Sequence, residues 1–309
     1  MSSNAHVPVL LGPVLKGLKI KPDGCYVDGT FGRGGHSKEI LKQLGDAGRL
    51  IAIDRDPDAI AAAPASLTAD PRFELIRGES AQLETFIDER GLSGKVDGLL
   101  FDLGVSSPQL DEADRGFSFM RDGPLDMRMD PDSGQSASEW LATVDEQELK
   151  YVLRKYGEEN SAARIARAIV QARDEAPISR TAQLARIIED AAPQRGQKKH
   201  PATKTFQAIR IAINGELEQL ESLLSQSVDV MRKGARLCVI SFHSLEDRIV
   251  KRFMRDASRE SEQYRGMPNV PEEYQPKLRT IGKAISATDE EIDANRRARS
   301  ARLRIAERT

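Results

Sequence analysis

Short apolar runs alternate with helical patterns along the first hundred residues, and this alternation constrains the fold more than any other feature. The runs lie at residues 26–27, 50–53, 73–76 and 96–101. Residues 37–44 place Ile40, Leu41 and Leu44 on one helical face, and Gly45 ends that pattern. Strands that alternate with helices in this way form a parallel sheet with both faces covered. We therefore expect an α/β domain.

The alternation breaks after Asp102. Residues 110–129 have the composition of a loop, and three helical patterns follow before residue 202 without a strand between them. Helix and strand patterns then return: a long amphipathic pattern at 205–231, an apolar run at 237–240 and an alternating run at 301–306. Residues 256–297 are polar and give no clear pattern. We predict a discontinuous domain, 1–110 with 203–309, that carries an inserted helical domain, 111–202.

A glycine-rich turn follows the first run and opens the first helix. Gly32, Gly34 and Gly35 stand where backbone amides approach a ligand closely, but Ser37 occupies the position of the third glycine of a dinucleotide fingerprint. A nicotinamide oxidoreductase is therefore disfavoured. A cofactor without a pyrophosphate remains compatible with the turn.

Two acidic residues end apolar runs and converge on the same sheet edge. Asp54 stands 19 residues after Gly35, where a carboxylate holds a ribose diol in nucleotide-binding folds. Asp102 ends the fourth run. Open α/β sheets bind ligands at the carboxyl ends of their strands. Together with the glycine turn, these carboxylates predict an adenosine-containing cofactor.

Composition limits the other classes of function. The net charge is −2 and the pI about 6.2, so any nucleic acid must be bound by local basic patches. One such patch is Lys198, Lys199, His200 and Lys204. A second, 296–304, is rich in arginine, and either phosphate binding or protection of an edge strand would explain it. No apolar run is long enough to cross a bilayer, no secretory signal is recognisable, and the two cysteines suit free thiols, so we expect a cytoplasmic protein.

Six segments together resemble the RsmH (MraW) family, the bacterial 16S rRNA cytosine-N4 methyltransferases. They are DGTFGRGGH at 28–36, AIDRDP at 52–57, DLGVSSPQ at 102–109, RGFSFM at 115–120, GPLDMRM at 123–129 and SFHSLEDR at 241–248. The resemblance runs from His6 to the C-terminal LRIAER. It implies a class I, Rossmann-like methyltransferase with a mostly parallel seven-stranded sheet, an antiparallel last strand and an inserted all-helical domain.

The resemblance also implies a cofactor, S-adenosylmethionine, and the residues that bind it. Gly34, Gly35 and His36 match the turn that holds the methionine part, and Asp54 matches the ribose-binding acid. Further cofactor contacts are carried over onto three other positions: Ser80 beside the adenine, Asp102 and Gln109. The expected partner is 16S rRNA within the small ribosomal subunit, with no membrane, and a homodimer is a further expectation.

Methyl transfer to the N4 amino group needs alignment and a proton acceptor. The nitrogen lone pair is delocalised into the ring, so a polar acceptor beside the amino hydrogens would assist attack. We expect Asp102, Ser106 or Ser107 to accept from the amino group. We expect Phe117 or Phe119 to stack on the flipped base, and Lys198 and Lys199 to contact RNA.

Other classes of function fit the sequence less well. His243 lies between two serines, but no nucleophile elbow is present, so a hydrolase is disfavoured. The four histidines and two cysteines show no zinc spacing, and no metal site is expected. A methyltransferase acting on a protein or small molecule is the main alternative. A non-catalytic RNA-binding module is disfavoured because Asp102 and the glycine turn are both present.

Overall fold

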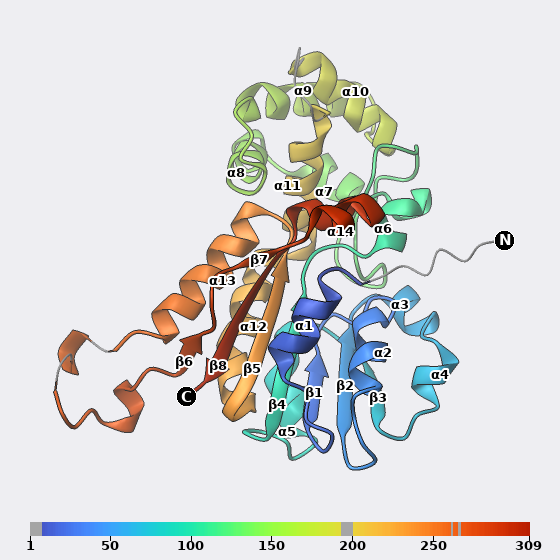
Figure 1. The fold of residues 1–309 in the computed structure, drawn as a ribbon. Coiled ribbons are helices and arrows are strands. Elements are labelled where there is room, and N and C mark those ends of the chain that lie inside the picture. The colour runs from blue at the N-terminus through green and yellow to red at the C-terminus, as the bar shows by residue number, and fades with distance from the viewer. Residues whose placement is uncertain (1–7, 193–199, 261, 265–266) are drawn as a thin grey trace. The chain divides into compact units, whose positions relative to one another are not determined.

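The computed structural model describes residues 8–192, 200–260, 262–264 and 267–309, and these residues form two compact units (Figure 1). The first unit comprises residues up to Gly104 together with Glu218–Thr309, and the second is Val105–Leu217. The predicted insertion, 111–202, lies inside the second unit. Within the described ranges, no helix has the length and apolar character needed to span a membrane.

An eight-stranded, mostly parallel sheet forms the centre of the first unit, and its strand order is β3-β2-β1-β4-β5-β8-β6 with β7 paired to β8. Strands β3, β2, β1, β4 and β5 are parallel, and β8 runs antiparallel to β5. The strands of this sheet are β1 (Cys25–Asp28), β2 (Arg49–Asp54), β3 (Phe73–Arg77), β4 (Val96–Asp102), β5 (Met231–Ser241), β6 (Leu278–Thr280), β7 (Ile285–Ser286) and β8 (Arg302–Arg308).

The six predicted strands are confirmed, but the predicted count of seven is wrong. The additional strands β6 and β7 are three and two residues long and lie in the segment without a clear sequence pattern. Both are largely exposed and pair only with β8. The predicted antiparallel direction of the last strand is confirmed.

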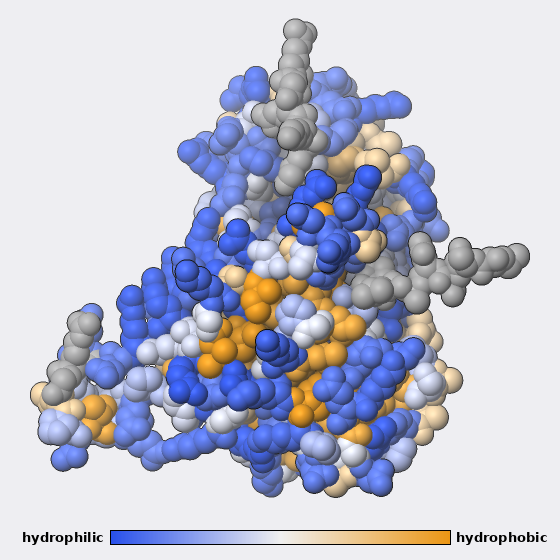
Figure 2. All heavy atoms as spheres, viewed as in Figure 1, coloured by the Kyte–Doolittle hydropathy of each residue, from blue (hydrophilic) through white to orange (hydrophobic). Residues whose placement is uncertain are grey.

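Helices cover both faces of the sheet. The helices of the first unit are α1 (Leu11–Leu18), α2 (Gly35–Leu41), α3 (Pro57–Ala61), α4 (Ala65–Thr68), α5 (Leu83–Asp88), α12 (Glu216–Val230), α13 (Ser244–Ala257) and α14 (Asp289–Ala294), with 3₁₀ turns η1 (Ser80–Gln82), η3 (Glu262–Tyr264), η4 (Glu272–Tyr274) and η5 (Arg296–Ser300). Residues of α5, α12 and α13 join one apolar cluster, whereas α1, α2 and η5 contribute to the cluster on the other face. Figure 2 shows hydrophobic side chains in a band across the face that carries α1 and β8.

The second unit is helical and has its own buried residues. Its elements are α6 (Ser107–Asp111), η2 (Ala113–Arg115), α7 (Ala137–Thr143), α8 (Glu146–Gly157), α9 (Ala162–Glu175), α10 (Thr181–Ala191) and α11 (Ala202–Asn214). The amphipathic pattern at 205–231 does not form one helix, because Gly215 adopts a left-handed conformation (φ 56°) and separates α11 from α12. The predicted helix at 37–44 also begins and ends earlier, at Gly35 and Leu41.

Candidate cofactor site

The carboxyl ends of β1, β2 and β4 bring three aspartates to one sheet edge. Asp28, Asp54 and Asp102 are the last residues of these strands, and β1 pairs in parallel with both β2 and β4. Parallel neighbours end at the same edge, which is why residues far apart in sequence meet there. The backbone N–H of Asp102 donates to Thr30 Oγ1 at 2.6 Å, so the ends of β1 and β4 are also joined directly.

The glycine turn after β1 leaves room for a ligand at one position and is tightly packed at another. Gly32 and Gly34 have φ angles of 55° and 72°, which disfavour side chains. A Cβ at Gly32 would meet no atom within 4 Å, whereas a Cβ at Gly34 would lie 2.7 Å from the ring of Phe31. Gly34 therefore shapes the turn, and the backbone at Gly32 faces open space.

Asp54 is held by two backbone N–H groups. Gly32 N–H donates to Oδ2 at 2.7 Å and Asp56 N–H donates to Oδ1 at 2.9 Å. Each carboxylate oxygen keeps a second lone pair for another donor. Burial raises the pKa of this carboxyl, and the backbone donors oppose that shift. The arrangement fits a pair of ribose hydroxyls, which need two acceptors side by side.

Asp102 combines a buried, unpaired oxygen with a histidine neighbour. Its side chain is 25% exposed, yet Oδ1 is buried without a hydrogen-bond partner among the described residues. Oδ2 lies 3.5 Å from His36 Nδ1. Burial, followed by the charges of Asp28 and Glu246, raises the pKa of Asp102 to about 8. A buried polar atom left without a partner is costly, so this oxygen is a position where a ligand donor fits.

His36 supports Asp102 with its ring. His36 Nε2 lies 3.0 Å from the carbonyl oxygen of Val9, and a carbonyl only accepts, so Nε2 carries the proton and Nδ1 is an acceptor facing Asp102. Burial lowers the pKa of His36 to about 4, so the ring is neutral. In the ligand-free protein, a proton on Asp102 suits this pair of facing acceptors. The side chain is thereby engaged, which leaves the backbone of His36 for the predicted methionine contact.

Sequence reasoning assigned no role to Asp28, although it belongs to the first motif. Its carboxylate accepts from Ser37 Oγ at 2.7 Å and from Thr30 N–H at 3.2 Å. Burial raises its pKa to about 7. The residue fixes the turn, and its charged form raises the pKa of Asp102. Its position directly after the apolar run 26–27 was the available signal.

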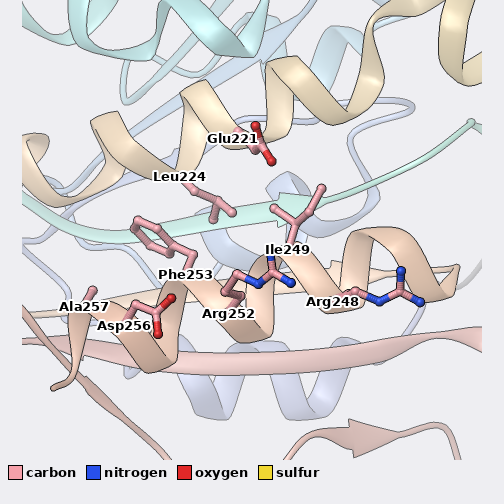
Figure 3. A pocket seen from close by; sticks show the side chains of 8 residues that line it. All are labelled: Glu221, Leu224, Arg248, Ile249, Arg252, Phe253, Asp256 and Ala257. Carbon is pink, nitrogen blue, oxygen red and sulfur yellow. The ribbon is translucent and has the colours of Figure 1, made fainter. Parts of the chain in front are cut away.

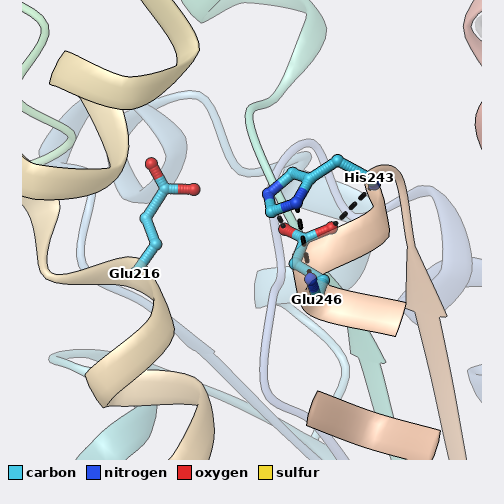
Figure 4. A group of neighbouring side chains, drawn as sticks. All are labelled: Glu216, His243 and Glu246. Atoms are coloured by element: carbon cyan, nitrogen blue, oxygen red, sulfur yellow. Dashed lines mark hydrogen bonds and ion pairs between the residues drawn. The ribbon is translucent and has the colours of Figure 1, made fainter. Parts of the chain in front are cut away.

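Glu246 was also missed, and it explains the motif around His243. Its buried carboxylate accepts from the backbone N–H of Phe242 at 2.8 Å and of His243 at 3.2 Å (Figure 4). Glu246 N–H donates to His243 Nδ1 at 3.4 Å, and His243 Nε2 lies 3.2 Å from Glu246 Oε1. The pair forms a capping box that begins α13. The His–x–x–Glu spacing is the sequence signal for this cap, and the cap occupies the imidazole that a hydrolase would need.

Ser80 holds the turn after β3 against the end of β1. Its hydroxyl donates to the carbonyl oxygen of Gly29. The contact of Ser80 beside the adenine remains a prediction. The Ser80 hydroxyl already has a partner within the protein, the carbonyl oxygen of Gly29.

The remaining predicted residues lie in the second unit. Gln109 is buried, and its Oε1 accepts from Ser106 N–H at 2.9 Å as part of the cap of α6, which begins at Ser107. Phe117 is only 5% exposed and lies beneath the guanidinium of Arg115. Phe119 stacks on His200 at a centroid distance of 4.4 Å. Lys198 and Lys199 lie outside the described residues.

A hollow of about 370 Å³ lies between α12 and α13 (Figure 3). Leu224, Ile249 and Phe253 give it an apolar floor, and Glu221 from α12 lies across from the arginines of α13. None of the strand-end aspartates lines it. The candidate cofactor site is therefore the sheet edge and not this hollow.

The sheet order and the reversed strand β8 define a class I, Rossmann-like methyltransferase fold, and the strand-end carboxylates suit its adenosine cofactor. The model of the MraW methylase family matches residues 3–309, so the chain belongs to that family. The cofactor of this family is S-adenosylmethionine.

Solved structures that are similar to this chain include three from different bacteria. A protein from Clostridium thermocellum is 14% identical, with a TM-score of 0.46 over 98% of this chain and 100% of its own. TrmN from Thermus thermophilus is 10% identical, with a TM-score of 0.44 over 97% and 48%. An rRNA methylase from Streptococcus thermophilus is 11% identical, with a TM-score of 0.41 over 98% and 99%. Similarity at this level carries no functional argument, so the assignment rests on the family model.

Proposed function

We propose that this protein transfers a methyl group from S-adenosylmethionine to N4 of a decoding-centre cytidine in 16S rRNA, at position 1402 in the conventional rRNA numbering. Family membership over nearly the whole chain supports an rRNA methylase. The observation that carries the site is the unpaired, buried Oδ1 of Asp102 beside the glycine turn. A methyltransferase of a protein or small molecule is the alternative that the experiment below separates.

The residues of the sheet edge fit S-adenosylmethionine, whose sulfonium supplies an activated methyl group. Asp54 has two oxygens ready to accept from the ribose hydroxyls. The backbone of Gly34, Gly35 and His36 would hold the methionine part, because two of these residues are glycines and the side chain of His36 faces Val9 and Asp102. Ser80, Gln109 and Asp102 would complete the binding set.

Asp102 is the proposed acceptor for the substrate amino group. The N4 lone pair is delocalised, and a carboxylate that accepts an amino hydrogen localises it and later takes the proton. Asp102 must first lose the proton that its raised pKa retains near neutral pH, and the positive sulfonium of a bound cofactor would favour that loss. The resulting carboxylate is a stronger base than that of an ordinary aspartate. Ser106 and Ser107 follow within five residues and are the proposed secondary acceptors.

The proposed partner is the small ribosomal subunit, so the site of action would be the cytoplasm. Lys198 and Lys199 remain proposed RNA contacts. The homodimer also remains a proposal. For base stacking the structure offers less than predicted, because Phe117 is buried and Phe119 is stacked on His200. Met120 of the same motif is 80% exposed and is the apolar side chain that is free to reach a substrate.

The test uses small subunits from cells that lack the protein, incubated with it and methyl-labelled S-adenosylmethionine. We expect digestion of the 16S rRNA to release labelled N4-methylcytidine from one decoding-centre position. An Asp102→Asn protein serves as the control for contaminating activity. Unlabelled rRNA from a protein that binds the cofactor would refute the proposal and favour a protein or small-molecule acceptor.

A further inference from the structure

Five arginines lie within residues 296–304, and the structure separates them into two groups. Arg304 forms a two-pronged ion pair with Asp247 of α13, at 2.8 and 3.0 Å, and Arg297 is half-buried. Arg296, Arg299 and Arg302 are exposed, and we call these three the arginine row. In the described chain, no acidic side chain pairs with any member of the row, including the acids of the neighbouring α14.

The row results from a period of three in the sequence. Arg296 and Arg299 lie on η5, and residues three apart in a 3₁₀ helix share one face. Ala298 and Ala301 are 0% and 1% exposed and anchor this segment in the core. The small buried alanines fix the backbone, so the intervening arginines project outward. In Figure 2 the surface around α14 and the start of β8 is hydrophilic.

Edge-strand protection does not explain the row. That explanation requires β8 to lie at the border of the sheet, where outward charges block pairing with another chain. Strand β8 instead pairs with β5 on one side and with β6 and β7 on the other. Its backbone is already satisfied, so exposed arginines at its beginning need another reason.

The position of the row points to the substrate. Arg302 pairs with Ser241, the last residue of β5, so β8 begins at the same edge where β1, β2 and β4 end (Figure 1). The row thus lies at the same sheet edge as the candidate cofactor site, with β8 two strands away from β4 in the first unit. Guanidinium groups bind phosphates in two-pronged geometry, and RNA brings a continuous series of phosphates to a base that enters the site.

We propose that Arg296, Arg299 and Arg302 bind the phosphate backbone of the RNA that carries the target base. This inference rests on the proposed function, because it assigns the RNA contact of the catalytic unit itself. With a net charge of −2, the chain needs such a local patch to bind a polyanion. Arg304 and Arg297 are not part of the contact.

The test compares the binding of unmethylated small ribosomal subunits at several salt concentrations. Replacing all three arginines with alanine should lower the slope of log affinity against log salt by about 2, at about 0.7 per phosphate contact on single-stranded RNA. When salt rises from about 50 to about 200 mM, the affinity of the variant should therefore fall about 20-fold less than the affinity of the wild type. The KM for subunits should rise, and the dissociation constant of S-adenosylmethionine should stay within about twofold, which also verifies folding.

A matched variant replaces Lys42, Lys95 and Lys233, three exposed cations toward the amino ends of the strands, with alanine. It removes the same charge and should keep the wild-type slope. A row of lysines in place of the arginines should also retain most of the slope, which a merely structural role would not explain. If the triple variant fails to fold, each single alanine variant should lower the slope by about 0.7.

Equal slopes for the wild type and the arginine variant would overturn the inference, as would an equal loss in the lysine control. The proposed function fails separately, when the wild type leaves the rRNA unlabelled. In that case the slopes still report whether the row binds RNA.

Discussion

The motifs of the sheet unit and those of the helical unit use their side chains differently. At the sheet edge, Asp54 keeps free lone pairs and Asp102 keeps an unpaired oxygen. In the helical unit, Gln109 caps its own helix, and Phe117 and Phe119 pack internally. The backbone pairing of parallel strands places their last residues at one edge, so these side chains remain available to a ligand. A loop has no such pairing, and its own side chains form the contacts that stabilise it. Recognisable motifs therefore divide into ligand-binding and loop-forming residues, and only the structure separates the two.

The largest effect on stability should come from the helical unit. Replacing Phe117 with alanine should destabilise the protein by about 3–5 kcal/mol, because a buried ring leaves a cavity. Urea unfolding measures this. Met120→Ala, three residues away at an exposed position, should change stability by less than about 0.5 kcal/mol. Equal costs for the two substitutions would contradict the division between packing and exposed residues in this motif.

Within the glycine turn, Gly34→Ala should cost about 2–4 kcal/mol, since it combines a left-handed φ with a close approach to Phe31. Gly32→Ala has the same kind of φ but open space, and should cost only about 1 kcal/mol. Thermal melting of both variants without ligand tests this. A larger loss of stability at Gly32 than at Gly34 would contradict the tight packing of Gly34 against Phe31.

Asp54→Ala should weaken S-adenosylmethionine binding by about 10²-fold, through loss of charge-assisted hydrogen bonds to the ribose. Calorimetric titration provides the measurement. Asp58→Ala, an exposed aspartate four residues further on, is the control and should bind normally. Normal cofactor affinity in Asp54→Ala would remove this residue from the site.

The free energy of unfolding should depend on pH because two strand-end aspartates bind protons in the folded protein. The folded protein holds protons on Asp28 and Asp102, whose pKa values are raised to about 7 and about 8, while the unfolded chain releases them near 3.8. Because the native state binds more protons across this window, stability should fall as pH rises from about 4 to about 8. Asp102→Asn should flatten the slope of the unfolding free energy against pH. An unchanged slope would contradict the assigned protonation state.

The sequence predicted the sheet where its strands are long and apolar. Strands β2 and β4, and β5 from Ala235 onward, contain continuous buried runs, so periodicity and composition were sufficient. Strands β6 and β7 are short and exposed, and they exist only because β8 offers a partner far away in sequence. Gly215 carried a signal for the break between α11 and α12, but the apolar pattern continued through it.

In the candidate site, too, the residues at the ends of apolar runs were predictable, whereas contacts between distant segments were not. Asp54 and Asp102 end apolar runs, which placed them at the edge. The contact between His36 and Asp102 joins residues 66 positions apart, and no local pattern indicates it. The role of Ala298 and Ala301 in presenting the arginine row likewise depends on which core they enter.

The most direct test of the account is the rate of methyl transfer by Asp102→Asn at saturating S-adenosylmethionine in a single turnover on unmethylated small subunits. Loss of the proton acceptor should lower this rate by at least about 10²-fold, beyond any loss of cofactor affinity, because general-base assistance contributes about 10²–10⁴-fold. A variant that keeps both the wild-type rate and the wild-type cofactor affinity would contradict the role assigned to Asp102.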